Sequence, residues 1–104
     1  MSAKSRLSAR QGERFFMYYV YVLRCYLKNK PSFYIGRCKN LKKRVKRHLN
    51  GEVKTTSKFD KMKLAYYEAC LNKPDAYKRE KQLKTGYGRG YLNRRLENYL
   101  EKRD

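Results

Sequence analysis

The chain has 104 residues, a length that suits one small domain with a modest hydrophobic core. Its 28 Lys and Arg residues against 9 acidic residues give a formal net charge of +19, so nucleic acid is the expected partner. No stretch approaches the ~20 apolar residues that span a bilayer, and no helical pattern has the broad aliphatic face of a membrane-surface helix. We therefore expect no membrane partner.

The cysteines predict neither a disulfide framework nor a zinc site. Cys25, Cys38 and Cys70 are odd in number and widely spaced, and His48 is the single histidine. A structural zinc ion needs four ligands, which these residues do not supply in any recognisable spacing. We expect reduced thiols in a cytoplasmic protein, since the start of the sequence also lacks the apolar core of a signal peptide.

Taken in chain order, the sequence begins with a tail and a hairpin. Residues 1–14 mix small, polar and basic types without periodicity, and they predict a flexible basic tail ahead of a single domain over residues 15–104. Residues 15–25 are a nearly unbroken apolar and aromatic run, typical of a central strand covered on both faces. The polar residues 28–31, which include a proline, predict a turn into an antiparallel strand over residues 32–37.

A basic helix is expected next, over residues 41–49. Asn40 is a good N-cap, and Gly36 allows a sharp turn between strand and helix. Arg44 and His48 are four residues apart, so they lie on one face of this helix. Seven of the twelve residues from 37 to 48 are Lys or Arg, so a polyanion would be drawn here. The residues that we expect to bind nucleic acid are Arg37, Lys39, Lys42, Lys43, Lys46 and Arg47, with Lys58 and Lys84 further along the chain.

The second half of the chain predicts one more strand and two more helices. After a polar loop, residues 61–71 read as a strand on which Met62, Leu64 and Tyr66 share a face. A helix begins near Pro74, and three glycines precede a last helix over residues 91–100. The element order is therefore β-β-α-β-α-α, an α+β fold in which helices flank a small three-stranded antiparallel sheet.

Two tripeptides on the first two strands carry a resemblance to a known family. Tyr34-Ile35-Gly36, followed by Asn40, Arg44 and His48, resembles the second half of the GIY-YIG nuclease signature. Tyr19-Val20-Tyr21 stands where the first half belongs, with Tyr19 in place of the glycine. Residues 37–44 are similar to the run that follows the YIG tripeptide in the C subunit of bacterial excision-repair nucleases. The resemblance covers roughly residues 17–92 and implies the same small sheet with flanking helices.

The resemblance implies roles for four residues of this region. The family uses the tyrosines of both tripeptides in its active site, so Tyr21 and Tyr34 are candidates for activating water, with no choice made between them. Arg44 matches the family's arginine, a fixed cation for the charge that develops on phosphate. His48 would orient the water or bind phosphate. From residue type alone, each tyrosine could instead be a core residue, and Arg44 one more solvated charge.

Glu80 is the candidate metal ligand. It falls in the middle of the inward stripe of the helix that begins near Pro74, where a carboxylate needs a cation as its partner. That partner could be a Lys or Arg in a salt bridge. Residues 78–84 are similar to the region that holds the family's single metal-binding glutamate, so the resemblance implies one Mg²⁺ or Mn²⁺ on Glu80. Glu68 is the competing acid, expected at an edge or on the surface, and the scattered acids disfavour a two-metal site.

Two functions remain open from the sequence. The first is a metal-dependent endonuclease that hydrolyses phosphodiester bonds of DNA, directed by structure rather than sequence and suited to DNA repair. The second is a basic nucleic-acid-binding module that keeps the fold with little or no cleavage. The presence of every residue that the enzyme needs favours the first. RNA is not excluded as the substrate, and a monomer is favoured although the oligomeric state stays open.

Overall fold

A computed structural model of the chain describes residues 16–101, so the tail expected over residues 1–14 lies outside the described residues. The elements are β1 (Tyr18–Leu27), β2 (Lys30–Cys38), α1 (Leu41–Leu49), β3 (Lys61–Cys70), α2 (Lys73–Leu83), α3 (Gly86–Arg95) and α4 (Glu97–Glu101). The three strands form an antiparallel sheet in the order β2-β1-β3. The predicted α+β fold is confirmed. No helix within residues 16–101 is long and apolar enough to cross a bilayer.

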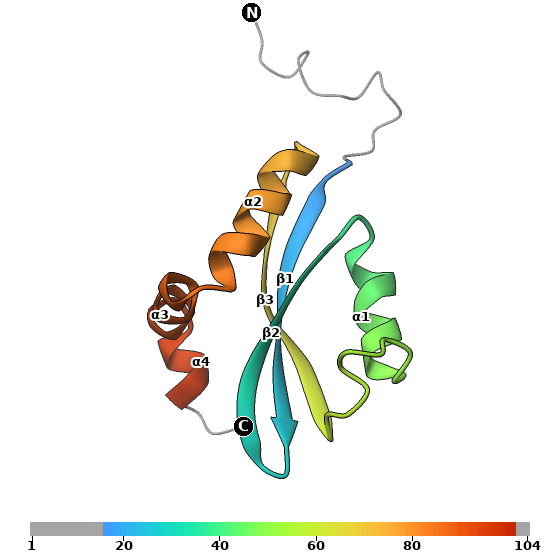
Figure 1. Cartoon of the computed structure of the whole chain (residues 1–104), viewed down its shortest axis with the longest axis vertical. Helices are drawn as coiled ribbons and strands as arrows, with labels where there is room; N and C mark the ends of the chain where they lie inside the picture. Colours follow the sequence, from blue (N-terminus) through green and yellow to red (C-terminus); the bar gives the residue numbers. More distant parts are fainter. Residues whose placement is uncertain (1–15, 102–104) are drawn as a thin grey trace, which may run out of the picture.

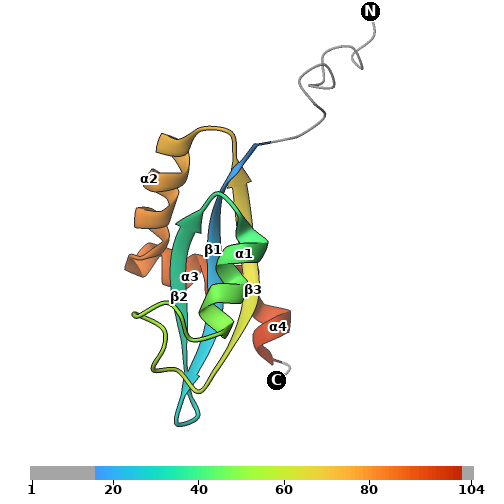
Figure 2. The same cartoon turned by 90° about the vertical axis from the view of Figure 1, so that its right-hand side faces the viewer.

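The helices divide between the two faces of the sheet. In Figure 1, α1 lies on one side of the strands and α2, α3 and α4 lie on the other, and Figure 2 shows α1 across the front of the sheet. The central strand β1 is buried on both faces: Tyr21, Leu23 and Cys25 pack on the α1 side, and Val20 and Val22 pack on the α2 side. Two cores therefore share one strand, which is why its sequence is apolar and aromatic except for Arg24.

The hairpin between β1 and β2 is tighter than predicted. Its turn consists of Lys28 and Asn29, whose φ angles of 52° and 66° give the two-residue turn that matches the twist of paired strands. Pro31 lies inside β2, opposite Tyr26, and not in the turn. Because β2 is an edge strand, a residue without an N–H group is tolerated there.

A β-bulge in β3 changes which of its residues share a face. The register against β1 shifts between Leu64 and Tyr66, which leaves Ala65 as the extra residue. The prediction that Met62, Leu64 and Tyr66 share a face is therefore wrong, since Met62 and Leu64 lie on the α1 side and Tyr66 on the α2 side. Glu68, two residues beyond Tyr66, turns to the α2 side with it.

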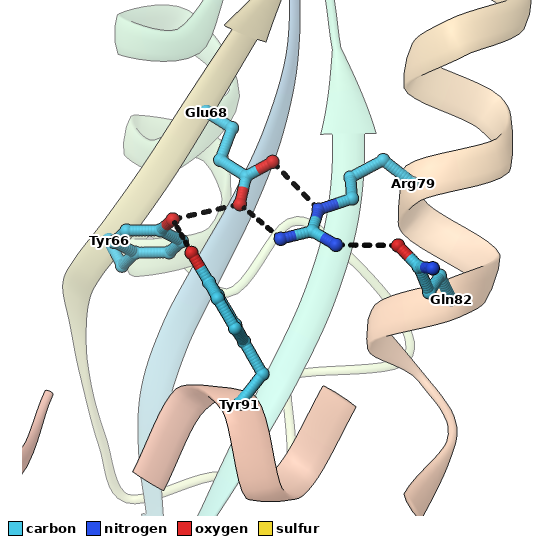
Figure 3. Close-up of polar contacts among 5 residues, drawn as sticks. All are labelled: Tyr66, Glu68, Arg79, Gln82 and Tyr91. Carbon is cyan, nitrogen blue, oxygen red and sulfur yellow. Dashed lines mark hydrogen bonds and ion pairs between the residues drawn. The ribbon is translucent and has the colours of Figure 1, made fainter. Parts of the chain in front are cut away.

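Glu68 is held between the sheet and two helices by the network drawn in Figure 3. Its carboxylate accepts hydrogen bonds from Arg79 Nε at 2.8 Å, from Arg79 Nη2 at 2.9 Å and from the Tyr66 hydroxyl at 2.8 Å. The Tyr91 hydroxyl, 2.9 Å away, then donates to Tyr66. The Arg79 bonds hold the pKa of Glu68 below its usual value. Glu68 lies on an edge strand as expected, but it joins β3 to α2 and α3, which makes it a structural residue.

The last helix begins earlier than predicted and is divided. The glycine-rich segment 86–90 forms the start of α3, where the Thr85 side chain accepts from the Gly88 N–H. Gly88 is buried against α2, and a Cβ there would overlap the Leu83 backbone, so only glycine permits this close packing. Leu96 separates α3 from α4.

Candidate active site

Helix α1 carries two of the candidate catalytic residues to the sheet, and it begins where the sequence predicts. Asn40 has an extended backbone, and its side chain accepts from the Lys43 N–H at 3.1 Å. Gly51, with a φ of 77°, follows the helix end. Within these limits Arg44 and His48 lie one turn apart, and the His48 side chain is completely buried.

Gly36 makes room for the Tyr21 phenol. The two residues are opposite each other on β2 and β1. A Cβ at position 36 would lie 2.5 Å from the Tyr21 hydroxyl oxygen and 2.6 Å from Cζ, a separation that carbon atoms do not reach. The expectation that Gly36 turns the chain is wrong, because the residue lies within β2. Glycine is required at position 36 because the Tyr21 ring lies directly over it.

A chain of hydrogen bonds connects the candidates on the α1 side of the sheet. Arg44 Nε donates to the Tyr21 hydroxyl oxygen at 3.1 Å, and this oxygen lies 2.7 Å from His48 Nε2. His48 Nδ1 lies 2.7 Å from Thr56 Oγ1, which donates to the Val53 carbonyl at 3.4 Å. We call Tyr21, Tyr34, Arg44, His48 and Thr56 the tyrosine–histidine cluster.

The groups at the two ends of this chain have fixed roles, whereas the direction of the two His48 bonds depends on the His48 tautomer. The Arg44 guanidinium can only donate, and the Val53 carbonyl can only accept. With the Thr56 hydroxyl donating to the Val53 carbonyl at 3.4 Å, the hydroxyl oxygen accepts from His48 Nδ1–H. The bare Nε2 of His48 then accepts the proton of the Tyr21 hydroxyl. We therefore assign His48 as the neutral tautomer protonated on Nδ1.

The electrostatics of the buried groups agree with this assignment. Burial raises the pKa of Tyr21 to about 12, although the hydrogen bond and charge of Arg44 oppose the shift. Burial, helped by the charges of Arg44 and Arg47, lowers the pKa of His48 to about 4. At neutral pH the phenol is protonated and the imidazole is uncharged. Arg44 is the cation of the cluster.

Tyr34 lies beside the chain of bonds and is more accessible. Its ring centroid is 5.2 Å from that of His48 and 6.4 Å from that of Tyr21. Its hydroxyl accepts from Thr55 Oγ1 at 3.4 Å. Tyr34 is partly exposed, whereas Tyr21 is fully buried. The two tyrosines therefore differ: Tyr21 is buried and hydrogen-bonded to Arg44 and His48, whereas Tyr34 is partly exposed to solvent.

Glu80 approaches β2 from the opposite side of the sheet. Its Oε1 accepts from Arg37 Nε at 2.8 Å, and its Oε2 lies 3.1 Å from Lys84 Nζ. Arg37 lies opposite Val20, on the α2 side, three residues after Tyr34. The structure thus brings the four candidate catalytic residues together and attaches Glu80 to the same edge strand through Arg37. No hydrogen bond or ion pair of the described residues joins Glu80 to the tyrosine–histidine cluster.

Comparison with known proteins identifies the family of this arrangement. A family model described as the GIY-YIG catalytic domain matches residues 17–93, which include the tyrosine–histidine cluster and Glu80. The chain belongs to the GIY-YIG family. The resemblance seen in the two tripeptides is thereby confirmed.

Several relatives of this GIY-YIG protein are small chains as well. It is 42% identical over 69 residues to a UPF0213 protein of Clostridium perfringens, a match that covers 65% of this chain and 71% of the relative. UPF0213 proteins of Staphylococcus epidermidis and Staphylococcus saprophyticus are 35% and 33% identical over 69 residues, covering 80% of each relative. No solved structure gives a significant match. The names of these relatives state no activity, so membership implies a nuclease-type fold and leaves the reaction to be argued.

Glu80 has the donor chemistry for a divalent ion. Mg²⁺ takes hard oxygen ligands and is often held by one or two carboxylates, with water and substrate phosphate completing its shell. No group of three or more metal-ligating side chains occurs within residues 16–101, so a metal ion here would have few protein ligands. The Glu80 side chain is 14% exposed, and those of Arg37 and Lys84 are 35% and 54% exposed. Because both cations reach solvent, either can leave the carboxylate at small cost.

The predicted nucleic-acid-binding residues all lie on the surface of this GIY-YIG domain. All eight are exposed: Arg37, Lys39, Lys42, Lys43, Lys46, Arg47, Lys58 and Lys84. Lys43 and Arg47 line a shallow pocket of about 260 Å³ together with Arg44. The pocket is therefore basic, and it contains the guanidinium that donates to the Tyr21 hydroxyl.

Sequence reasoning missed Thr56 and the purpose of Gly36. Thr56 belongs to the polar loop over residues 52–60, in which Lys58 was the residue expected to bind nucleic acid. Thr56 is completely buried, and its hydroxyl oxygen lies 2.7 Å from His48 Nδ1. The available signal was a pair of threonines seven and eight residues after the histidine, and it becomes specific only when the loop folds back on α1.

Proposed function

We propose that this GIY-YIG protein is a metal-dependent endonuclease that hydrolyses phosphodiester bonds of DNA, directed by structure rather than sequence. The observation that carries the proposal is the directed chain of hydrogen bonds from Arg44 through Tyr21 and His48 to Thr56. Buried polar groups are costly unless every one is paired, and apolar side chains would fill the same space more cheaply. This series of hydrogen bonds is fully paired and ends in the Arg44 guanidinium at the surface, where a cation can act on a substrate phosphate.

Tyr21 and His48 form a proton path in the proposed reaction. The Tyr21 oxygen takes a proton from the attacking water while its own proton moves to His48 Nε2, so the phenol stays neutral. In the free protein, Arg44 donates a hydrogen bond to a lone pair of this oxygen. When the guanidinium turns to a phosphate, the lone pair of Tyr21 becomes available to water. Burial is the main cause of the lowered His48 pKa, and the phosphate would offset the smaller contribution of the Arg44 and Arg47 charges.

The remaining groups act on the charge of the phosphate. Arg44 is cationic at any working pH and stabilises the negative charge that develops in the transition state. Glu80 would hold one Mg²⁺ or Mn²⁺, and this ion supplies further charge stabilisation at the phosphate. The partly exposed Tyr34 would contact the substrate beside His48.

The charge of the chain supports DNA as the substrate. A net charge of +19 and eight exposed basic residues around the site attract a phosphate backbone whatever its sequence. RNA carries the same backbone charge and stays a second possible substrate. DNA repair, where damaged or branched strands are cut without regard to sequence, is the setting that this proposal suits.

The alternative function is a basic nucleic-acid-binding module that keeps the fold without cutting. One observation favours it: the ion pairs of Glu80 with Arg37 and Lys84 satisfy the carboxylate without a metal ion. Under this alternative the protein binds DNA and leaves it intact.

A cleavage assay separates the two functions. Branched, nicked and linear DNA are incubated with the protein and Mg²⁺ or Mn²⁺, and the wild type is compared with Tyr21→Phe. Loss of the hydroxyl breaks the proton path, so the rate should fall by about 10²-fold or more. Tyr19→Phe, on the same strand face but outside the chain of bonds, is the control and should cut normally. Binding of all three DNAs with no cleavage of any would establish the alternative.

A further inference from the structure

A cavity lies along the free edge of β2, where Tyr34 is the one residue that it shares with the tyrosine–histidine cluster. It has a volume of about 510 Å³ and is formed by residues of β2 and of the α2–α3 region. This volume is within the range of pockets that bind small ligands. Its apolar part comes from Ile35, Leu83 and Leu92, which also belong to the core on the α2 side.

Positive charge surrounds this apolar floor. Arg24, Lys84 and Arg89 line the cavity, and none of its lining residues is acidic. Lys84 is paired with Glu80, whereas Arg24 and Arg89 have no ion-pair partner within residues 16–101. The Arg24 guanidinium lies over the Phe33 ring, 4.6 Å from its centroid, so the two groups form a stacked pair that lines the cavity. The cavity therefore suits a ligand with a flat apolar body and an anionic group.

The cavity lies between the two parts of the proposed active site. Tyr34 lines it and also contacts the His48 ring of the tyrosine–histidine cluster. Lys84 lines it and is paired with Glu80, the candidate metal ligand. The cavity is therefore linked to each part of the proposed site through one shared residue.

We infer that this cavity receives an unpaired nucleotide of the DNA strand, next to the phosphate that is cut. Its base stacks on the Arg24–Phe33 pair, and the Asn93 amide, which can donate and accept, meets the edge of the base. Arg89 pairs with the neighbouring phosphate. A base within a duplex cannot enter without unpairing, so the cavity selects DNA with a flap, gap or frayed end. The inference rests on the proposed function and narrows its substrate class.

Binding without divalent metal tests the inference apart from catalysis. Fluorescence anisotropy in EDTA measures the Kd of a duplex with a short single-stranded flap and of a blunt duplex with the same number of phosphates. Stacking and hydrogen bonding of one base should make the flap duplex bind at least about fivefold more tightly. Equal Kd values in the wild type would overturn the inference.

Two pairs of matched variants locate the preference in the cavity. Arg89→Ala and Arg94→Ala each remove one exposed charge from α3, but only Arg89 lines the cavity. Asn93→Asp and Asn98→Asp each add one carboxylate without changing size, and only Asn93 lines the cavity. The cavity variants should reduce the flap preference to about twofold or less, while the controls keep it. Equal losses within either pair would overturn the assignment.

Failure of the inference and failure of the proposed nuclease activity give different results. A protein that prefers flaps through Arg89 and Asn93 but does not cut DNA with Mg²⁺ or Mn²⁺ supports the cavity inference and refutes the nuclease proposal. A protein that cuts flap and blunt duplex equally, with no effect of the cavity variants on binding, refutes the cavity inference alone.

Discussion

Substitution of Gly36 by alanine should displace the Tyr21 hydroxyl and stop cleavage. The added Cβ would lie 2.5 Å from the hydroxyl oxygen, so the phenol must move by roughly 1 Å to regain ordinary contact. This movement breaks the 2.7 Å bond to His48. Overpacking of this kind costs about 1–3 kcal/mol, and a reactive group misplaced by about 1 Å can lose ~10²-fold in rate.

The control for this variant is Gly51→Ala. Gly51 has a φ of 77° and no side chain within 4 Å of the new Cβ, so alanine there introduces backbone strain of about 1–2 kcal/mol without touching Tyr21. Thermal unfolding followed by circular dichroism should show both variants melting several degrees below the wild type. Only Gly36→Ala should lose cleavage. If the two variants cut at the same rate below their melting temperatures, the argument that Gly36 exists to seat the phenol is refuted.

Three further predictions follow from the site. His48, the single histidine, should titrate near pH 4 in the folded protein, which NMR of its ring protons measures directly. The pKa of His48 is lower in the folded than in the unfolded protein, so the free energy of unfolding should fall by up to about 3 kcal/mol as pH drops from about 6.5 to about 4. A free energy of unfolding that does not change over this pH range would contradict the burial of His48 in its neutral form. Glu80→Gln should abolish metal-dependent cleavage. It should change the free energy of unfolding by only about 1 kcal/mol, because Arg37 is partly exposed. A marked loss of stability with normal cleavage would show that Glu80 has a structural role instead. Arg44→Ala should abolish cleavage and keep most DNA binding, while the exposed Lys42→Ala should cost little; equal cleavage by both would remove Arg44 from the site.

Features that depend on near neighbours could be predicted from the sequence. The cap at Asn40 needs only the N–H three residues later, and the burial of β1 on both faces follows from its own apolar run. Both were confirmed. The family could be recognised as well, because its two tripeptides and Arg44 occur within one short hairpin and helix. These local signals were sufficient for the fold and for the identity of the catalytic candidates.

The bulge at Ala65 could not be predicted in this way. Nothing in the pattern of β3 interrupts its alternation, and the extra residue appears only when the strand is paired with β1. Its effect is large, because it moves Tyr66 and Glu68 to the opposite face of the sheet. Glu68 then meets Arg79 and becomes part of the network in Figure 3 instead of facing solvent.

The partners of the buried and half-buried polar groups also depend on packing over long sequence distances. Among 28 basic residues, charge alone does not say which one meets a given carboxylate, because ionic attraction carries little directional information. Glu80 pairs with Arg37, 43 residues away, only because α2 packs across β2. In the same way, Tyr21 and His48 are 27 residues apart, and their bond forms because α1 crosses the face of the sheet where Gly36 leaves space. The sequence specifies the chemical groups, and the contacts between distant elements determine which of them share protons.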